Sequence, residues 1–511
     1  MTPMKSNQTP KKPLPSTLYS AEALRNLDSI AINQYNIAGY ELMKRAGKAL
    51  FNYFQDQYPL AKHVTVFCGS GNNAGDGYIF AWLAMQAKLK VSVVSLVGIN
   101  KLQGDAKFAW KEWHARGHQK VECSDELLQK SDVIIDALLG TGLSRDVDGE
   151  WAETIDAINN SGKPVISVDI PSGIYADTGR VAGHAIRATS TMTFVGLKKG
   201  LFTHNGVDHC GELVFENLGL PANIYAKQPA QAHLLNWSQL QSSLKKRKAS
   251  AYKHQCGHLL ILGGDWGMPG AIRLTAEAAL RAGAGLVTVV THALHAPVVL
   301  SMQPEIMLIS SGDGHVPAEL LSKVNAIVVG PGLSDSHWSQ NLLSDALGCD
   351  APKVVDAGAL RLLSEEDGRR DDWILTPHPG EAGEMLGETS DCIQDSRFSS
   401  AELLQQKYGG YILLKGAGSI VQSPGGLAQL CPYGNPGMAT AGMGDVLSGV
   451  LGALLAQGYD MQTASRLGVC IHSIAADIAA TKGQVGLVAS DLYPHIRQLI
   501  NPVPGKGNKG V

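Results

Sequence analysis

Apolar positions along this chain follow a helical spacing first and a strand-like spacing afterwards. Residues 20–55 carry apolar side chains three or four positions apart, which predicts two amphipathic helices. Their buried faces are expected to hold Leu24, Leu27, Ile30, Ala31, Leu42, Met43, Ala46 and Leu50. From residue 63 onward, short runs of almost only apolar residues alternate with helical segments. Such runs are typical of strands in a parallel sheet that helices cover on both faces.

The apolar runs form two series with a polar, basic stretch between them. The first series comprises residues 63–69, 90–98, 132–140, 164–171 and 191–196. The second comprises residues 257–264, 286–291, 326–333, 353–360, 373–381 and 411–421. The intervening stretch, QSSLKKRKASAYKHQ at 241–255, is typical of a linker or a surface connection. The two series do not resemble each other residue for residue, which argues against an internal duplication.

The length of the chain supports the same division. With 511 residues it exceeds the roughly 250–300 residues beyond which a single hydrophobic core stops growing. We therefore predict two doubly wound α/β domains, at residues 17–240 and 241–500. The first 16 residues contain four prolines and no apolar core segment, so we expect a disordered tail rather than a secretory signal. A flexible tail is expected at 501–511.

The composition of the chain mainly excludes certain partners and locations. The formal net charge of -3 provides no broad positive field, so no nucleic-acid partner is expected. The eight cysteines are scattered without a CxxC pair, which favours reduced thiols in the cytoplasm. No run of about 18 apolar residues is present, so no membrane-spanning helix is expected.

Three aspartates in the first half follow successive predicted strands. Asp76 lies in the glycine-rich loop NNAGDG at 72–77, Asp136 ends the third run, and Asp169 ends the fourth. Because ligands of an open parallel sheet bind beyond the carboxyl ends of its strands, the three carboxylates are expected at one rim. The glycines around Asp76 and Asp136 would let the backbone approach a phosphate closely. The alternative is structural, since each aspartate could cap a helix.

The segments LMKRAG, NNAGDG, DALLGTGL and VDIPSG make residues 17–235 similar to the NAD(P)H-hydrate epimerase domain, which has a Rossmann-like fold. The resemblance implies that the hydrated dinucleotide contacts Asn72, Asn73, Ala74, Gly75, Asp76, Gly140, Thr141, Gly142, Leu143, Ser144, Arg145, Asp146 and Asp169. It also implies a potassium ion between Asn73, Asp136 and Ser172. Oxygen ligands of these kinds suit a hard cation.

One residue departs from the pattern of that family, since its usual NNGGDG is NNAGDG here. If Ala74 had to take a positive φ, its Cβ would cost on the order of 1 kcal/mol. Epimerisation requires a C–O or C–N bond to break and to form again from the other face, which a carboxylate can assist by moving a proton. Asp169 is the expected carrier of that proton.

A second glycine-rich turn, AGMGDVLSG at 441–449, opens a predicted helix in the other half. Its backbone N–H groups would face a phosphate, and Asp445 would take a proton from the attacking hydroxyl. Lys415 ends an apolar run before a glycine turn, a position suited to the phosphates of a nucleotide, and His378 follows a strand between two prolines. Each alone has a structural alternative, as a helix-capping aspartate, a solvated lysine or a structural histidine.

The segments GPGL, DAGAL, LTPHPGE, KGAGS and AGMGDVLSG make residues 245–500 similar to the ribokinase-like, ADP-dependent NAD(P)H-hydrate dehydratase domain. That resemblance implies contacts to the hydrated substrate from Ala271, Gly332, His378 and Asp445. It implies contacts to the adenine nucleotide from Lys415, Gly416, Ala417, Gly418, Ser419 and Gly444. A magnesium ion is expected to accompany ADP. Met443 replaces a small or hydroxylated residue, so one hydroxyl contact is expected to be missing.

The two resemblances together imply a bifunctional repair enzyme with catalytic Asp169 and Asp445. It would interconvert the epimers of hydrated NADH or NADPH and dehydrate the S epimer with ADP, which gives AMP and phosphate. One alternative is a ribokinase-like kinase for a vitamin precursor or a sugar. Another is that the first half is a nucleotide-binding or interaction module without activity. A homo-oligomer is expected.

Overall fold

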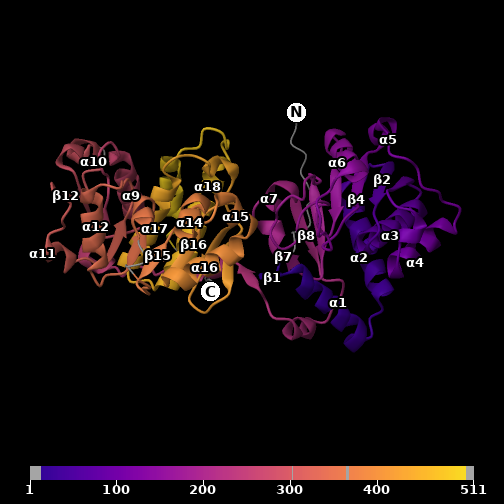
Figure 1. Cartoon of the computed structure of the whole chain (residues 1–511), viewed down its shortest axis with the longest axis horizontal. Coiled ribbons are helices and arrows are strands. Elements are labelled where there is room, and N and C mark those ends of the chain that lie inside the picture. The colour runs from indigo at the N-terminus through magenta and orange to yellow at the C-terminus, as the bar shows by residue number, and fades with distance from the viewer. Residues whose placement is uncertain (1–12, 302, 364–367, 502–511) are drawn as a thin grey trace, which may run out of the picture. The chain divides into compact units, whose positions relative to one another are not determined.

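The computed structural model describes residues 13–301, 303–363 and 368–501. The chain divides into two compact units, an N-terminal unit, Met1–His233, and a C-terminal unit, Leu234–Val511 (Figure 1). The sequence pattern placed this change between residues 240 and 241. Most of the two expected tails, at 1–16 and 501–511, lies outside the described residues.

The N-terminal unit is built on a six-stranded sheet in which all neighbouring strands are parallel. The strands are, in spatial order, β3 (Lys90–Ser95), β2 (His63–Cys68), β4 (Val133–Ala137), β5 (Val165–Val168), β6 (Ser190–Phe194) and β8 (Glu212–Glu216). The helices are α1 (Ala21–Tyr35), α2 (Gly39–Gln57), α3 (Asn72–Gln86), α4 (Gly104–His114), α5 (Asp125–Lys130), α6 (Gly149–Asn160) and α7 (Gly206–His209). Short strands β1 (Thr17–Tyr19), β7 (Leu197–Lys198) and β9 (Ala232–Leu234) complete the unit's β structure.

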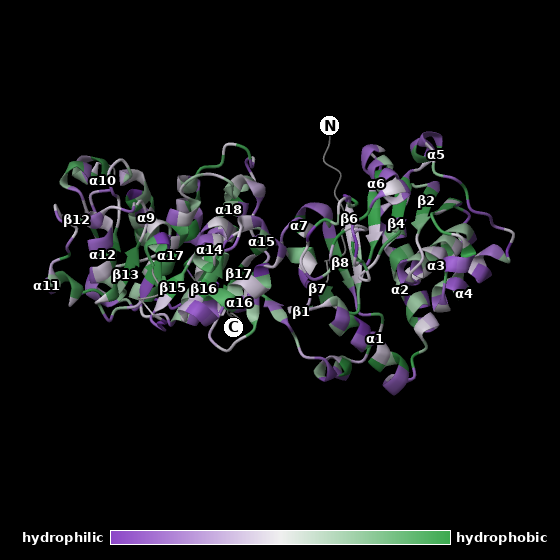
Figure 2. Ribbon diagram, viewed as in Figure 1, coloured by the Kyte–Doolittle hydropathy of each residue, from purple (hydrophilic) through white to green (hydrophobic). Residues whose placement is uncertain are grey.

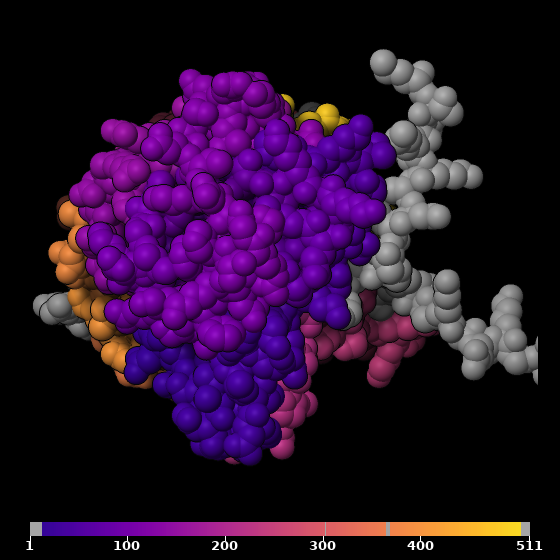
Figure 3. All heavy atoms as spheres, turned by 90° about the vertical axis from the view of Figure 1, so that its right-hand side faces the viewer, coloured from indigo at the N-terminus to yellow at the C-terminus, as the bar shows by residue number. Residues whose placement is uncertain are grey.

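The five strands expected in this half are present, and β8 is an additional edge strand. The sequence pattern missed β8 because its residues are only half-buried and lack a continuous apolar run. The strand order reverses at β2, which lies between β3 and β4. In a doubly wound fold this reversal is the point where ligands bind. Figure 3 shows the N-terminal unit as spheres, with indigo residues of the first helices beside purple residues of later elements.

The C-terminal unit contains a run of nine neighbouring strands. In spatial order they are β12 (Met307–Ser310), β11 (Leu286–Thr291), β10 (His258–Leu262), β13 (Ala326–Val329), β14 (Lys353–Val355), β15 (Trp373–Leu375), β16 (Tyr411–Leu414), β17 (Ser419–Gln422) and β18 (Ala428–Cys431). The strands from β12 to β16 are parallel, whereas β17 and β18 run antiparallel to their neighbours. The expectation of a wholly parallel sheet is therefore wrong at this end, because the glycine turn at 415–418 folds the run 411–421 into a hairpin.

Helices cover both faces of this sheet (Figure 1). They are α8 (Trp237–Leu240), α9 (Pro269–Arg281), α10 (Ala296–Leu300), α11 (Ala318–Leu321), α12 (His337–Leu347), α13 (Gly358–Leu362), α14 (Pro379–Leu386), α15 (Ser390–Asp395), α16 (Arg397–Tyr408), α17 (Met443–Ala456), α18 (Met461–Ala480) and α19 (Tyr493–Leu499). Short 3-10 turns include η4 (Gln241–Ser243), η5 (Lys253–Cys256) and η6 (Ala293–His295).

Helix α17 is the central helix of the C-terminal unit. Every residue in it is buried except Gly444 and Asp445, which lie in its first turn. Figure 2 shows α17 and the strands in green, as expected of a helix that is apolar on all sides. Because the other twelve residues of α17 are buried, Gly444 and Asp445 are held in a defined position at its accessible first turn.

Two further observations concern the cysteines and the helices of both units. None of the eight cysteines forms a disulfide bond. Among the described residues, no helix combines the length and the apolar character that crossing a bilayer requires.

Gly449 allows α17 to cross α9 closely, because an added Cβ would overlap the carbonyl oxygen of Thr275. We expect Gly449→Ala to destabilise the protein by about 2 kcal/mol through overpacking. Gly270→Ala is the matched helix control, because its Cβ would meet nothing within 4 Å. Urea unfolding of the full chain, followed by circular dichroism, measures both. Equal midpoints for the two variants would contradict the proposed close crossing.

Candidate functional sites

A cavity of about 490 Å³ opens in the N-terminal unit, at the carboxyl ends of β2 and β4. Most of the residues expected to contact substrate line it, namely Asn72, Asn73, Asp76, Gly140, Thr141, Gly142, Leu143, Ser144, Arg145 and Asp169. Ala74, Gly75 and Asp146 are not among its lining residues. Ala74 is buried in the hydrophobic core, and Gly75 faces the thioether of Met43. The cavity therefore lies where the strand order reverses.

The local structure around NNAGDG differs from the expectation in two respects. Ala74 lies inside α3 and is not among the residues with a positive φ, so the expected strain does not arise. The glycines at 69, 75 and 77 approach other parts of the protein rather than open space. At Gly77, for example, an added Cβ would lie 2.8 Å from the Cβ of Ala137. Only Gly71, which caps α3, faces open space among these four.

The three residues expected around a potassium ion are linked by hydrogen bonds, and one of them, Asn73, lines the cavity. Asp136 is fully buried, and its carboxylate accepts hydrogen bonds from the hydroxyl and the backbone N–H of Ser172 and from the hydroxyl of Ser167. Asn73 donates its amide N–H to the carbonyl oxygen of Leu139 at 3.2 Å, and the backbone N–H of Leu139 donates to the Ser172 hydroxyl at 2.8 Å. Burial raises the pKa of Asp136, although the hydrogen bonds from Ser172 oppose this.

Asp169 follows β5 with a φ of +67° and forms an ion pair with Lys198, whose side chain is 1% exposed. The backbone N–H of Phe194 donates to the same carboxylate at 2.9 Å. Lys198 also donates to the hydroxyl of Thr193 at 2.8 Å and to the carbonyl of Phe194 at 3.1 Å. The charge of Asp169 is therefore compensated inside the cavity.

Two other acids in the same cavity have raised pKa values. Burial, followed by repulsion from Asp169, raises the pKa of Asp28 to about 6, and Lys198 lowers it less. Burial, followed by repulsion from Asp169 and Asp28, also raises the pKa of Asp76 well above its ordinary value. The helix-capping alternatives are wrong for Asp76, which is inside α3, and for Asp136, which is inside β4. Sequence reasoning missed Asp28 and Lys198, because neither lies in a glycine-rich loop.

The ion pair of Lys198 with Asp169 is expected to contribute to the stability of the N-terminal unit. Lys198→Met should destabilise the N-terminal unit by about 3 kcal/mol, because it leaves a largely buried carboxylate without its partner. The double variant Lys198→Met/Asp169→Asn removes that unpaired charge and should recover more than half of the loss. Urea unfolding of the full-length variants at pH 7 measures both. A double variant no more stable than Lys198→Met alone would contradict this account.

The second candidate site lies at the first turn of α17. Lys415 at the end of β16 places its ammonium 2.7 Å from the carboxylate of Asp356 and 3.7 Å from that of Glu381. The hydroxyl of Ser448, one turn into α17, donates to the other oxygen of Asp356 at 2.7 Å. Gly444 faces the same ammonium, since a Cβ added there would lie 3.3 Å from it. The structure thus brings Lys415, Gly444 and Asp445 together.

Charge pairing controls the protonation of this site. Burial disfavours charge on Lys415 and Asp356, but their mutual attraction prevails, so the pKa of Lys415 is raised and that of Asp356 is lowered. Burial and then repulsion from Asp356 raise the pKa of Asp445 to about 6, with Lys415 opposing. Gly442 caps α17 without a side-chain hydrogen bond, so the early N–H groups of the helix are not capped in that way. Asp356 and Glu381 were not identified from the sequence, although DAGAL and LTPHPGE contain them.

His378 has a structural role, which was the alternative to substrate contact in the sequence analysis. It caps α14, and its Nδ1 accepts the backbone N–H of Gly380 at 3.0 Å and of Glu381 at 3.2 Å. Its side chain remains 55% exposed, and Nε2 lies 3.5 Å from the Glu381 carboxylate. Capping therefore leaves the other ring nitrogen near the site.

Of the expected nucleotide-binding segment, residues 415–418 form the turn between β16 and β17, and Ser419 begins β17. The buried guanidinium of Arg397 supports this turn from behind, because it donates to the carbonyl oxygens of Leu414, Lys415 and Gly418. Sequence reasoning missed Arg397, which has no motif around it.

The remaining predicted residues are positioned as follows. Ala271 lies near the start of α9, after β10, and Gly332 follows β13, the neighbouring strand. Met443 is buried in the hydrophobic core. The replacement at this position therefore changes the packing beneath the turn rather than its accessible surface.

The fold and the two sites define an α/β protein with two acid-lined sites in separate units. Residues 259–498 match the family model described as NAD(P)H-hydrate dehydratase, and residues 39–200 match the model described as YjeF-related protein N-terminus. The chain is 44% identical to the bifunctional NAD(P)H-hydrate repair enzyme Nnr of Coxiella burnetii, over 95% of this chain and 100% of that protein. It is 38% identical to the enzyme of the same name from Escherichia coli, over 96% and 95%.

The chain therefore belongs to the family of bifunctional NAD(P)H-hydrate repair enzymes. These relatives do not favour the alternative of a small-molecule kinase. A crystal structure of the ADP/ATP-dependent NAD(P)H-hydrate dehydratase from Bacillus subtilis, co-crystallised with ATP/Mg²⁺, aligns with a TM-score of 0.47 and 28% identity. That alignment covers 52% of this chain and 96% of the other.

Proposed function

We propose that the N-terminal unit interconverts the R and S epimers of hydrated NADH and NADPH. We further propose that the C-terminal unit dehydrates the S epimer with ADP, which gives the reduced dinucleotide, AMP and phosphate. The main support is that each unit places a carboxyl group with a pKa near 6 beside an ion pair at the carboxyl edge of its sheet. Family membership over nearly the whole chain supports the pairing of the two activities.

In the N-terminal cavity, Asp28 and Asp169 have different environments. Asp28, whose pKa is raised to about 6, can in its protonated form donate a proton to the hydroxyl leaving the hydrated ring. The ring nitrogen supplies the electron pair, and water then adds from the opposite face and returns a proton to a carboxylate. Asp169, paired with Lys198, places its carboxylate in the same cavity, where it stabilises the positive charge that develops on the ring. Asp169 remains the sequence-based candidate for proton transfer, and Asp28 is the structure-based one.

Asn73, Asp136 and Ser172 fit a potassium ion by their chemistry. The buried carboxylate of Asp136 is held by hydroxyl and N–H groups, and these partners are neutral. An oxygen-only set of carboxylate, amide and hydroxyl groups suits a hard, monovalent cation. A bound potassium ion would supply positive charge near the phosphates of the dinucleotide.

In the C-terminal site, Asp445 accepts the proton of the substrate hydroxyl while that oxygen attacks the terminal phosphoryl group of ADP. Lys415 and the N–H groups at the start of α17 stabilise the negative charge on the phosphoryl oxygens. The phosphorylated oxygen then leaves as phosphate, because the ring nitrogen donates its electron pair, and loss of a ring proton restores the double bond. Magnesium bound with ADP would screen the charge of the nucleotide.

Further parts of this proposal rest on composition. Eight unpaired thiols are consistent with a reducing compartment such as the cytoplasm. We also expect a homo-oligomer, which sedimentation of the full chain measures directly.

Two single variants should separate the activities. Asp445→Asn should lower ADP-dependent formation of NADPH by at least about a hundredfold, because the general base is lost. It should leave epimer exchange unchanged. Asp169→Asn should have the opposite effect and stop epimer exchange while the S epimer is still dehydrated. Absorbance at the reduced-nicotinamide band follows dehydration, and chromatography of the two epimers follows exchange. Loss of both activities in either variant, with the fold intact, would contradict separate sites.

The raised pKa of Asp28 predicts a pH dependence of epimerisation. The charged groups lining the same cavity are Arg25, Asp76, Asp105, Arg145, Asp169 and Lys198. Asp28 is the proposed acid, so its active form is protonated and is lost as the pH rises through about 6. The enzyme-dependent rate should therefore fall by about tenfold per pH unit above that value. Asp28→Asn should be slow and should lack this dependence. A variant that keeps the wild-type profile would exclude Asp28 as the acid.

A further inference from the structure

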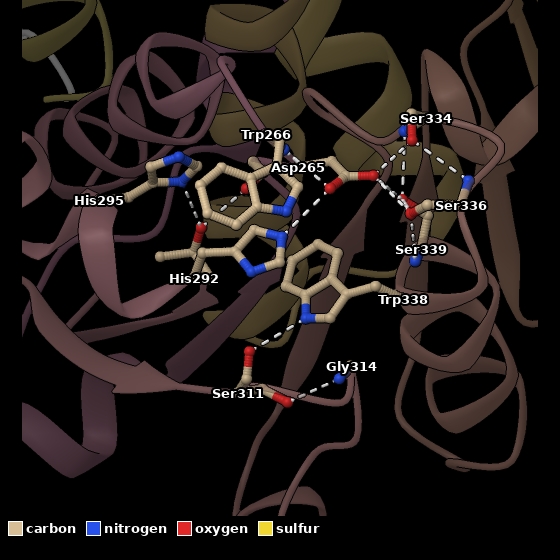
Figure 4. Close-up of polar contacts among 12 residues, drawn as sticks. Asp265, Trp266, His292, His295, Ser311, Gly314, Ser334, Ser336, Trp338 and Ser339 are labelled. Carbon is tan, nitrogen blue, oxygen red and sulfur yellow. Dashed lines mark hydrogen bonds and ion pairs between the residues drawn. The ribbon is translucent and has the colours of Figure 1, made fainter.

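The segment that follows β10 forms a hydrogen-bonded cluster to which the proposed chemistry assigns no role. Its centre is the carboxylate of Asp265, whose side chain is 4% exposed. One oxygen accepts hydrogen bonds from the hydroxyls of Ser334, Ser336 and Ser339 (Figure 4). The other accepts the backbone N–H of Trp266 at 2.7 Å and lies 3.1 Å from Nε2 of His292. Burial would raise the pKa of Asp265, but these hydrogen bonds together lower it.

Three aromatic rings are stacked beside this carboxylate. His292 lies between two indoles, with ring centroids 4.0 Å from Trp338 and 5.0 Å from Trp266 and interplanar angles of 21° and 28°. The inner indole, Trp338, is buried and donates its N–H to the carbonyl oxygen of Ser311 at 3.0 Å. The outer indole, Trp266, is 67% exposed. The stack therefore begins in the protein interior and ends at an accessible ring.

The position of this stack links it to substrate. Strand order in the C-terminal unit reverses at β10, which lies between β11 and β13, and ligands of doubly wound sheets bind at such a reversal. The backbone N–H of Asp265 donates to the carbonyl oxygen of Gly332 at 2.7 Å. Met268 also lies close to Gly332, since a Cβ added to Gly332 would approach Met268 to 3.0 Å. Gly332 is a proposed substrate contact, so Trp266 belongs to a loop that borders the proposed substrate site.

We propose that Trp266 is the platform on which the adenine ring of the hydrated dinucleotide stacks, and that Asp265 and His292 are positioning residues that hold this indole in place. The proposal rests on the proposed dehydratase function. The dihydronicotinamide ring is not aromatic, and hydration converts two more of its carbons to tetrahedral centres, so adenine is the aromatic ring of the substrate. Stacking of a base on an exposed aromatic side chain is favourable and does not require a hydrogen-bonded edge.

The proposal implies a contribution to binding rather than to chemistry. Adenine is identical in the hydrated substrate and in the repaired product and does not change in the reaction. Trp266 should therefore stabilise the ground state and the transition state equally. Removal of its indole should raise KM and leave kcat unchanged. Ordinary NADPH, the product, should lose affinity by the same factor.

The first experiment compares full-length wild type with Trp266→Ala and Trp266→Phe, using the S epimer of hydrated NADPH and ADP. Trp266→Ala should raise KM for the hydrate about tenfold, which corresponds to about 1.4 kcal/mol. The value of kcat and the KM for ADP should stay within about twofold. Trp266→Phe retains a flat ring and should recover most of the loss. Leu403→Ala, at an exposed apolar residue on α16, is the control and should match wild type.

The second experiment measures binding without turnover, by calorimetry with ordinary NADPH and with reduced nicotinamide mononucleotide, which lacks adenine. Trp266→Ala should weaken NADPH at one of the two dinucleotide sites and leave the mononucleotide unchanged. Asp265→Asn should weaken NADPH less than Trp266→Ala does. Combined with Trp266→Ala, it should have no further effect, because it acts only through the indole.

Several results would overturn the proposal. Unchanged affinity for NADPH in Trp266→Ala would exclude the platform, and an increase in KM for ADP alone would assign the ring to the nucleotide instead. Equal weakening of the mononucleotide would assign it to the nicotinamide half. If the wild type forms no NADPH from the hydrate while Trp266→Ala still weakens NADPH, the proposed dehydratase function fails and the stacking site remains.

Discussion

The pairing of one lysine, fully buried in one unit and partly buried in the other, with one carboxylate underlies both candidate sites. Lys198 compensates Asp169 in the N-terminal unit, and Lys415 compensates Asp356 in the C-terminal unit. In each case another acid in the site remains without its own cation and has a pKa near 6. An acid whose pKa is raised to about 6 therefore lies beside an ion-paired carboxylate in each site, so it can exchange a proton close to neutral pH. Removing either lysine would leave two like charges in competition.

The same electrostatic arrangement is built from different backbone elements. In the N-terminal unit the uncompensated acid, Asp28, comes from α1, which precedes the sheet in the chain. In the C-terminal unit Asp445 comes from the first turn of α17, and the burial of the rest of that helix determines its position. Both units therefore combine a lysine–carboxylate ion pair with a second acid of raised pKa, but they place these groups on different elements of the fold. This agrees with their dissimilar sequences.

The sequence predicted the central strands of both sheets, because burial on both faces requires a continuous apolar run. It missed strands without such a run, for example the edge strand β8. It also located Asp76 and Asp445 where glycine-rich segments open helices, although both residues lie inside those helices, α3 and α17, rather than in loops. It did not identify Asp28, Lys198 or Arg397, because these act through contacts between residues distant in the chain. The glycines near Asp76 were misinterpreted for a related reason, since a glycine that faces a neighbouring helix and one that faces a ligand look alike in sequence.

The support that Arg397 gives to the hairpin turn has a consequence for nucleotide binding. Its guanidinium donates hydrogen bonds to the carbonyl oxygens of Leu414, Lys415 and Gly418. The protein itself therefore orders the backbone of the turn. Ordering a flexible loop opposes association, because conformational entropy is lost when the complex forms. Here that loss occurs during folding instead. In the proposed function the nucleotide would therefore meet a preorganised surface, and its association would not require rearrangement of this turn.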